Sequence, residues 1–136
     1  MDFRAAVDDQ VSLLEAGAPL DAFDRYFADD GVMLDNDVVF GSGKAECRAK
    51  QEPFISAAKA IDGRIVRCTV DDALQICVFH NQSTFVTKDD ERVQIDGLHW
   101  QRWAGGKIVE ERYYRGELMR KRILAGILER PGALAL

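Results

Sequence analysis

The feature that most constrains the fold is a predicted β-hairpin over residues 97–114, with the sequence GLHWQRWAGGKIVEERYY. Its turn is Ala104-Gly105-Gly106-Lys107, and the Gly-Gly pair supplies the positive φ angles that a two-residue hairpin turn requires. The strand before the turn alternates in residue type, and one of its faces carries His99 where a packed core would hold an aliphatic side chain. The hairpin therefore predicts a sheet, and the histidine marks one sheet face as a candidate functional surface.

Composition and charge limit the class of protein. At 136 residues the chain is expected to form one domain with a single core. The net charge of -5 argues against nucleic acid or an anionic membrane as the main partner. The sequence lacks both a membrane-spanning apolar run and a signal-peptide core, so we expect a cytoplasmic protein. Cys47, Cys68 and Cys77 are few and scattered, which indicates free thiols in a reducing compartment.

Two helices are predicted before any strand. Apolar residues recur at helical spacing over residues 3–14, and Gly17-Ala18-Pro19 ends this helix. Asp21 can cap a second helix, which is expected to end at Asp29-Asp30-Gly31.

The next segment mixes a hairpin with further helix. A short hairpin is predicted over residues 32–40, with its turn at Asn36-Asp37. Gly43 marks the start of a third helix. Pro53 is expected to open another helical piece that ends near Ile61, because proline fits the first turn of a helix.

The rest of the chain predicts antiparallel strands, at residues 64–70, 73–88, 91–103 and 107–115. A helical extension over residues 117–130 follows, and we expect it to cover either a cavity mouth or a partner subunit. Helices followed by an antiparallel sheet indicate an α+β fold, in which N-terminal helices pack on a curved sheet. Residues 1–136 are expected to form this single domain.

Four short motifs in this order are similar to landmarks of the nuclear transport factor 2-like superfamily. They are Phe27–Val32, Gly43-Lys44 at a helix start, Trp100–Trp103 and Gly106–Glu110. The resemblance covers about residues 3–114 and is strongest to the SnoaL-like and ketosteroid-isomerase-like branches. It implies a cone-shaped fold with a ligand cavity between helices and sheet, and it leaves the reaction open because this fold serves many functions.

The two histidines are predicted to be cross-strand neighbours. A two-residue turn at Asp89-Asp90 pairs His80 with His99, and side chains alternate across a strand. The face with both histidines then also carries Ile76, Val78, Gln82, Thr84, Val86, Gln101 and Trp103. The resemblance implies that this face is the concave one that lines the cavity.

A carboxylate is expected to join the histidines. Asp35 matches the general-base aspartate of the ketosteroid-isomerase-like pattern, and His99 matches its proton-donating acid. Gln10 lies near the position of the family's donor tyrosine. Two of these three positions depart from the pattern, which argues against steroid isomerisation. An aspartate with histidines on adjoining strands resembles the scytalone-dehydratase type of site.

These groups suit proton transfer without an external cofactor. Imidazole can take a proton from the carbon beside a carbonyl and return it to a leaving hydroxyl. Asp35 can orient an imidazole or act as the base itself. Gln10, Gln82 or Gln101 could hold the oxygen on which negative charge develops.

Other interpretations of these residues stay open. His80 and His99 could be structural, bonded to backbone or water, or they could form a metal site with Asp35, although we expect no metal. Asp35 could be an ordinary turn residue beside Asn36-Asp37.

The last strand allows two registers. A regular turn sends Glu110, Arg112 and Tyr114 to the concave side, where Arg112 would favour an anionic or carbonyl-bearing ligand. A bulge would instead send Glu111 and Tyr113 there.

The other sheet face predicts an assembly. Its apolar patch comprises Phe79, Phe85, Leu98 and Trp100, and a patch of this size is expected to be covered by a homodimer partner.

Two classes of function therefore remain. The first is an acid–base enzyme, a dehydratase, isomerase or cyclase, with Asp35, His80 and His99 as catalytic residues and a small hydrophobic carbonyl compound as substrate. Its ligand would be held by Gln10, Gln82, Gln101, Trp103, Arg112 and Tyr114. The second is a module of the same fold that binds a small ligand or dimerises without catalysis.

Overall fold

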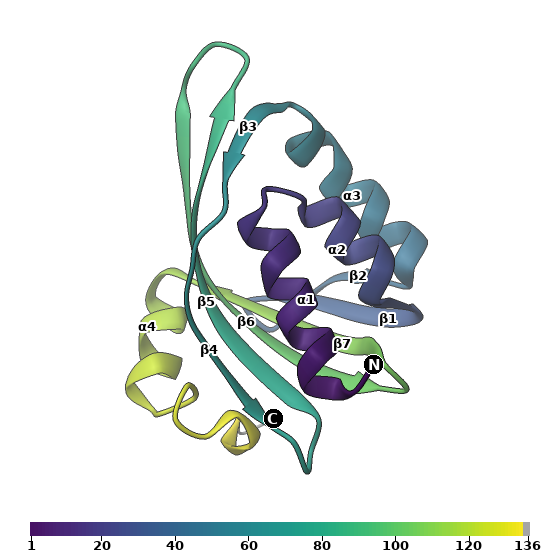
Figure 1. Ribbon diagram of the computed structural model, residues 1–136. Helices are drawn as coiled ribbons and strands as arrows, with labels where there is room; N and C mark the ends of the chain where they lie inside the picture. The colour runs from purple at the N-terminus through teal and green to yellow at the C-terminus, as the bar shows by residue number, and fades with distance from the viewer. Residues whose placement is uncertain (135–136) are drawn as a thin grey trace.

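Three helices lie over one face of a curved seven-stranded sheet, and a fourth helix packs on the other face (Figure 1). The computed structural model describes residues 1–134. The helices are α1 (Phe3–Glu15), α2 (Pro19–Tyr26), α3 (Lys44–Ser56) and α4 (Gly116–Leu124), followed by a 3₁₀ turn at Pro131–Ala133. The strands are β1 (Phe27–Asp35), β2 (Val38–Ser42), β3 (Ala58–Asp62), β4 (Ile65–Asp71), β5 (Ile76–Thr87), β6 (Arg92–Ala104) and β7 (Lys107–Arg115). The predicted α+β sandwich is confirmed.

The sheet has the order β2-β1-β7-β6-β5-β3, and β4 also pairs with β5. The first half of β5 pairs with β4 and its second half with β3. All pairs are antiparallel except β1 with β7. We call the face toward α1–α3 the inner face and the face toward α4 the outer face.

Local sequence explains several of the element boundaries. The Asp2 carboxylate accepts a hydrogen bond from the Ala5 amide (2.8 Å) and caps α1. Asn36 and Asp37 have φ angles of 49° and 67°, a conformation that asparagine and aspartate tolerate in tight hairpin turns. The predicted hairpin at this turn is confirmed, as β1 and β2.

Strand pairing overrides local helix signals at two places. The second helix ends at Tyr26, earlier than expected, because Phe27 already pairs with Ile108 of β7; its N-cap is Ala18 and not Asp21. Pro53 lies inside the last turn of α3 and does not open a new helix. The residues after α3 form β3, in which Ile61 pairs with Phe85.

Two apolar clusters hold the layers together. One lies between the inner face and the helices and includes Val7, Phe23, Phe27, Phe79 and Trp103. The other lies between the outer face and the C-terminal segment. It comprises Ile76, Val78, Leu98, Trp100, Tyr114, Met119, Ile127 and Leu128.

The residues of the predicted dimer patch therefore do not share one face of the sheet. Phe79 and Phe85 lie on the inner face, whereas Trp100 is buried on the outer face, where its Nε1 donates to the Pro131 carbonyl (3.0 Å). The C-terminal segment covers the outer face, so the expectation that it covers the cavity mouth is wrong (Figure 1). None of the helices within residues 1–134 is both long enough and apolar enough to cross a bilayer.

Candidate active site

The loop between β5 and β6 sets which side chains reach the inner face. The Thr87 amide donates to the Glu91 carbonyl (2.9 Å), so the loop is Lys88-Asp89-Asp90 and has three residues. Asp90 takes a positive φ of 64°, as the last residue of such a loop commonly does. This extra residue moves the pairing by one position from the predicted register. His99 pairs with Phe79, and His80 pairs with Leu98.

The two histidines lie on opposite faces of the sheet, and the prediction that they share one face is wrong. His99 faces the helices. His80 faces outward, where its Nε2 lies 2.7 Å from the Asp96 carboxylate. Gln82 lies on the same outer face and donates to Asp96 at 3.4 Å.

A bulge decides the inner face of β7. Trp103 pairs with Ile108 beside the Gly105-Gly106 turn, but Arg102 pairs with Glu110, so the register shifts between them. Beyond this bulge, Gln101 pairs with Glu111 and His99 with Tyr113. The bulged alternative is confirmed, and Glu111 and Tyr113 lie on the inner face.

Arg112 and Tyr114 consequently point outward, away from α1–α3 and toward the face on which α4 packs. Both donate to the Asp37 carboxylate, at 3.0 Å from Arg112 and 2.7 Å from Tyr114. They link β7 to the β1–β2 turn and are not ligand-binding residues of the inner face.

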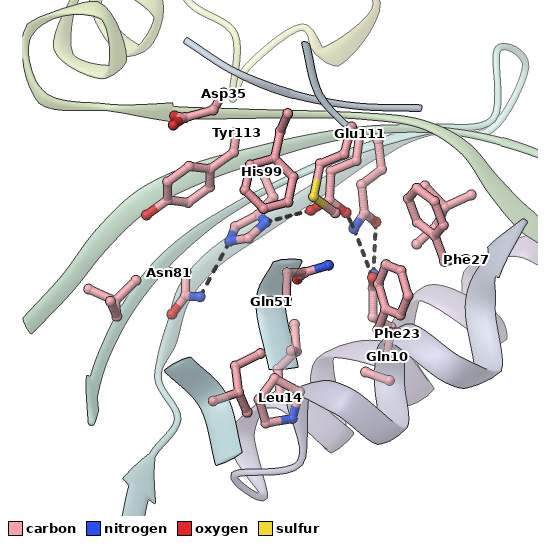
Figure 2. Close-up of a pocket in the computed structure, with 18 of the residues that line it drawn as sticks. Gln10, Leu14, Phe23, Phe27, Asp35, Gln51, Asn81, His99, Glu111 and Tyr113 are labelled. Atoms are coloured by element: carbon pink, nitrogen blue, oxygen red, sulfur yellow. Dashed lines mark hydrogen bonds and ion pairs between the residues drawn. The ribbon is translucent and has the colours of Figure 1, made fainter. Parts of the chain in front are cut away.

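A pocket of about 360 Å³ lies between the inner face and the helices (Figure 2). Of the predicted site residues, Gln10, Asp35, His99 and Gln101 line it. The others, His80, Gln82, Trp103, Arg112 and Tyr114, do not. Most of the wall is apolar and is formed by Leu14, Phe23, Phe27, Met33, Leu34, Phe40, Phe54, Ile55, Phe79, Phe85, Ile95 and Ile108.

One continuous chain of polar side chains crosses this apolar wall. Gln10 and Gln101 exchange two amide hydrogen bonds (2.9 and 2.8 Å), and Gln101 also donates to Glu111. The second Glu111 oxygen lies 3.2 Å from His99 Nδ1, and His99 Nε2 lies 3.4 Å from the Asn81 amide nitrogen (Figure 2). This series of hydrogen-bonded side chains begins with Gln10 on α1, which explains why a glutamine interrupts the apolar stripe of that helix.

Trp103 determines the donor and acceptor directions of these hydrogen bonds. Its indole N–H can only donate, and it lies 3.2 Å from Gln101 Oε1, which also accepts from Cys77 Sγ (3.1 Å). The Gln101 amide therefore presents its NH₂ group to Glu111. Trp103 supports the site from the core beneath it.

These contacts select one tautomer of His99. The Glu111 carboxylate accepts, so His99 donates through Nδ1–H and leaves the Nε2 lone pair toward the pocket. The only hydrogen-bond partner of Nε2 in the described part of the chain is Asn81, at 3.4 Å. His99 is therefore arranged as a base, with a buried carboxylate behind it.

Asp35 lies at the edge of the pocket, apart from this polar chain. Arg115 donates to both of its carboxylate oxygens, at 3.0 and 3.2 Å. The Asp35 side chain remains 35% exposed. In Figure 2 the carboxylate lies beyond Tyr113, which separates it from His99.

Burial keeps two further groups of the site neutral. It raises the pKa of the Tyr113 phenol, and the Asp35 charge acts in the same direction. Burial also raises the pKa of the Cys77 thiol well above its ordinary value, so Cys77 serves as a donor to Gln101 and not as a thiolate. No three histidine, cysteine or acidic side chains within residues 1–134 gather as a metal site would require.

Sequence reasoning missed Asn81 as a site residue and placed Glu111 on the inner face only as the bulged alternative. The signal for both residues lies in the length of the β5–β6 loop and in the β7 bulge, because these features place odd-numbered residues of β5 and β6, and of β7 beyond the bulge, on the inner face. Alternation within each strand identifies the two faces but does not say which face is covered by the helices.

The SnoaL-like domain model matches residues 7–111 of the chain. Several solved structures share the fold. A protein proposed to be a SnoaL-like polyketide cyclase from Mesorhizobium loti aligns with a TM-score of 0.69 at 24% identity, covering 85% of this chain and 100% of that one. An LEH-like epoxide hydrolase from M. tuberculosis aligns with a TM-score of 0.64 at 20% identity, covering 94% and 95%.

A cystatin-fold protein of uncharacterised function from Novosphingobium aromaticivorans has a TM-score of 0.68 at 14% identity, covering 85% of this chain and 99% of that one. No curated protein sequence matches the chain significantly. At these identities the solved structures establish the fold alone.

Proposed function

Because the chain belongs to the SnoaL-like domain family, we propose that it is an acid–base enzyme acting on a small hydrophobic carbonyl compound. Dehydration, isomerisation and cyclisation are the reaction types that such a site serves. The observation that carries the proposal is the His99–Glu111 pair at the polar end of an otherwise apolar pocket.

His99 is the proton-transfer residue of this proposal. Its Nε2 lone pair takes a proton from the carbon beside the carbonyl, and the resulting imidazolium is stabilised by Glu111 at Nδ1. The same imidazolium then returns the proton to a carbon or to a leaving hydroxyl. The carboxylate holds the tautomer and the ring orientation, as in other carboxylate–histidine pairs.

The surroundings of the pair fit this chemistry. The Glu111 side chain is 10% exposed, so little water competes for its hydrogen bonds. The apolar wall suits a hydrophobic skeleton, and the volume is at the small end of the range for ligand pockets. The polyketide cyclase and epoxide hydrolase named among the structural relatives are in keeping with a proton-transfer site.

The test is turnover of a panel of hydroxy-ketones, enones and lactones by wild-type protein and three variants. His99→Gln should lower kcat by about 10²–10⁴-fold, the usual contribution of a general acid–base group. Glu111→Gln should lower it as well, because a glutamine cannot accept from both Gln101 and His99 Nδ1. His80→Gln, on the outer face, is the matched control and should leave turnover unchanged.

Two outcomes would contradict the proposal. Turnover that survives in His99→Gln would show that His99 is not the base. Binding of panel compounds without turnover by the wild-type protein would favour the second class of function, a ligand-binding module of this fold.

A further inference from the structure

Tyr113 occupies an unusual position on the inner face. It pairs with His99 across β6 and β7, and its ring lies across the backbone of Gly97. A Cβ atom built on Gly97 would lie 2.2 Å from the Tyr113 hydroxyl oxygen and 2.2 Å from a ring carbon. Only glycine at position 97 therefore admits the phenol at this place.

The phenol adjoins the proposed base. His99 follows Gly97 by two positions on the same face of β6, and Asn81 is the partner of Gly97 on β5. The His99 and Tyr113 rings are 4.9 Å apart at an angle of 63°. Figure 2 shows Tyr113, His99 and Asn81 along the same side of the pocket.

The Tyr113 hydroxyl differs from the other two tyrosine hydroxyls of the chain. Tyr26 donates to Asp9 (2.5 Å) and Tyr114 donates to Asp37 (2.7 Å). Tyr113 lines the pocket, and in the described residues its hydroxyl has no hydrogen-bond partner in the protein. The hydroxyl is not among the fully buried polar atoms, so it is accessible from the pocket and can donate to a molecule bound there.

The group is suited to donate. Burial raises the pKa of the phenol, so it carries its proton at neutral pH. Gln10, which stands near the donor position implied by the family pattern, exchanges two hydrogen bonds with Gln101 and is engaged in that pair.

We propose that Tyr113 donates the hydrogen bond that holds the ligand's carbonyl oxygen, and that the absence of a side chain at Gly97 makes room for the Tyr113 phenol. This inference rests on the proposed function and makes Tyr113 a catalytic residue. When the C–H bond beside the carbonyl breaks, its proton passes to His99 Nε2. The electron pair of that bond forms the C=C bond, and the carbonyl π pair moves onto the oxygen. Tyr113 stabilises the resulting enolate oxygen.

The test uses 2-naphthol, an aromatic enol, and 2-methylnaphthalene, which has nearly the same shape without the oxygen. Binding of each to the full chain is followed by the fluorescence of the naphthyl group. Tyr113→Phe should weaken 2-naphthol binding about three- to tenfold, the usual worth of one neutral hydrogen bond, and leave 2-methylnaphthalene binding unchanged. Tyr114→Phe, the neighbour on the outer face, is the control and should change neither affinity.

Gly97→Ala gives an independent arm. The added methyl displaces the Tyr113 ring, so this variant should also lose its preference for 2-naphthol. Adding Tyr113→Phe to Gly97→Ala should then produce no further loss of preference.

The inference is overturned if wild-type protein does not prefer 2-naphthol, if Tyr113→Phe keeps the preference, or if Tyr114→Phe loses it equally. These readouts measure binding alone. If the binding results contradict the inference while turnover still depends on His99, the role of Tyr113 would be removed and the proposed function would stand. If Tyr113→Phe loses the preference for 2-naphthol but the wild-type protein turns over no panel compound, the role of Tyr113 in binding would stand and the proposed enzymatic function would not.

Discussion

Glu111 is the residue on which the polar chain of the pocket depends. Its two carboxylate oxygens face Gln101 and His99, on the neighbouring strand, and no lysine or arginine is among its hydrogen-bond partners in the described residues. A buried carboxylate is costly unless its lone pairs are satisfied. The donors of Gln101 and His99 offset that cost here, and Trp103 and Cys77 keep Gln101 turned the right way.

Asp35 is predicted to contribute to the entrance and not to proton transfer. Asp35→Asn keeps the shape of the side chain and removes its charge, so it weakens the pair with Arg115. Because Asp35 lies beyond Tyr113 from His99, we expect kcat to fall less than tenfold, far below the loss expected for a general base. Steady-state kinetics with any panel compound that the wild-type protein converts measures this change in kcat. A loss of about 10²-fold or more would instead identify Asp35 as the base.

At the scale of elements, the β5–β6 and β6–β7 registers determine the site. Alternation, turn residues and helical spacing predicted the α+β class and most element positions, because each of these signals is local. The register depends on one extra loop residue and one bulged residue, and both are tolerated by many sequences. His99 was therefore identified correctly as an inner-face residue, while His80 was assigned the wrong face and Glu111 was left as an alternative.

The contact between α4 and the β1–β2 turn is predicted to weaken in acid. Asp37 accepts from Arg122 of α4 (3.2 Å) as well as from Arg112 and Tyr114. Burial alone would raise the Asp37 pKa, but the hydrogen bonds from Tyr114 and Arg122 outweigh it and lower the pKa below its ordinary value of 3.8. The stabilisation is therefore present above the unfolded-state pKa and is lost as pH falls through the lower folded-state value.

Asp37→Asn is the matched variant, because asparagine tolerates the positive φ at this position. At pH 7 it should lower the free energy of unfolding by roughly 1 kcal/mol, a modest figure because the side chain is 38% exposed and water screens its charge. The difference from wild type should shrink as pH falls below about 4, the range in which an unfolded aspartate protonates. Urea unfolding at several pH values tests this, and a difference independent of pH would contradict it.

At the scale of the whole molecule, the C-terminal segment takes the place that a partner subunit is expected to fill. Residues 116–134 cover Ile76, Val78, Leu98 and Trp100 within one chain. A homodimer stays an expectation of the sequence, but the outer face around Trp100 is not free to form it. The segment is held by its own apolar contacts, by the Trp100 bond to Pro131 and by Arg122.

A chain ending at Arg115 should expose this apolar face. Four large side chains, Val78, Leu98, Trp100 and Tyr114, are almost fully buried in the full chain, so we expect the shortened chain to associate or precipitate. Light scattering measures the mass, and the tryptophan emission, to which Trp100 and Trp103 both contribute, should shift to longer wavelength as Trp100 becomes exposed to water. A shortened chain with the mass and emission of the full chain would show that the segment is dispensable.

The three-residue loop between β5 and β6 also bears on how such a pocket could change over evolution. Deleting one of its residues would leave a two-residue loop between Thr87 and Glu91, so every pair of β5 and β6 would stay as it is and Phe79 would still lie beside His99. A slip of the register itself would turn every side chain of one strand to the opposite face and take Cys77 and Phe79 out of the inner core. The length of this loop is therefore free to vary among related sequences, while the pocket that the register builds is preserved.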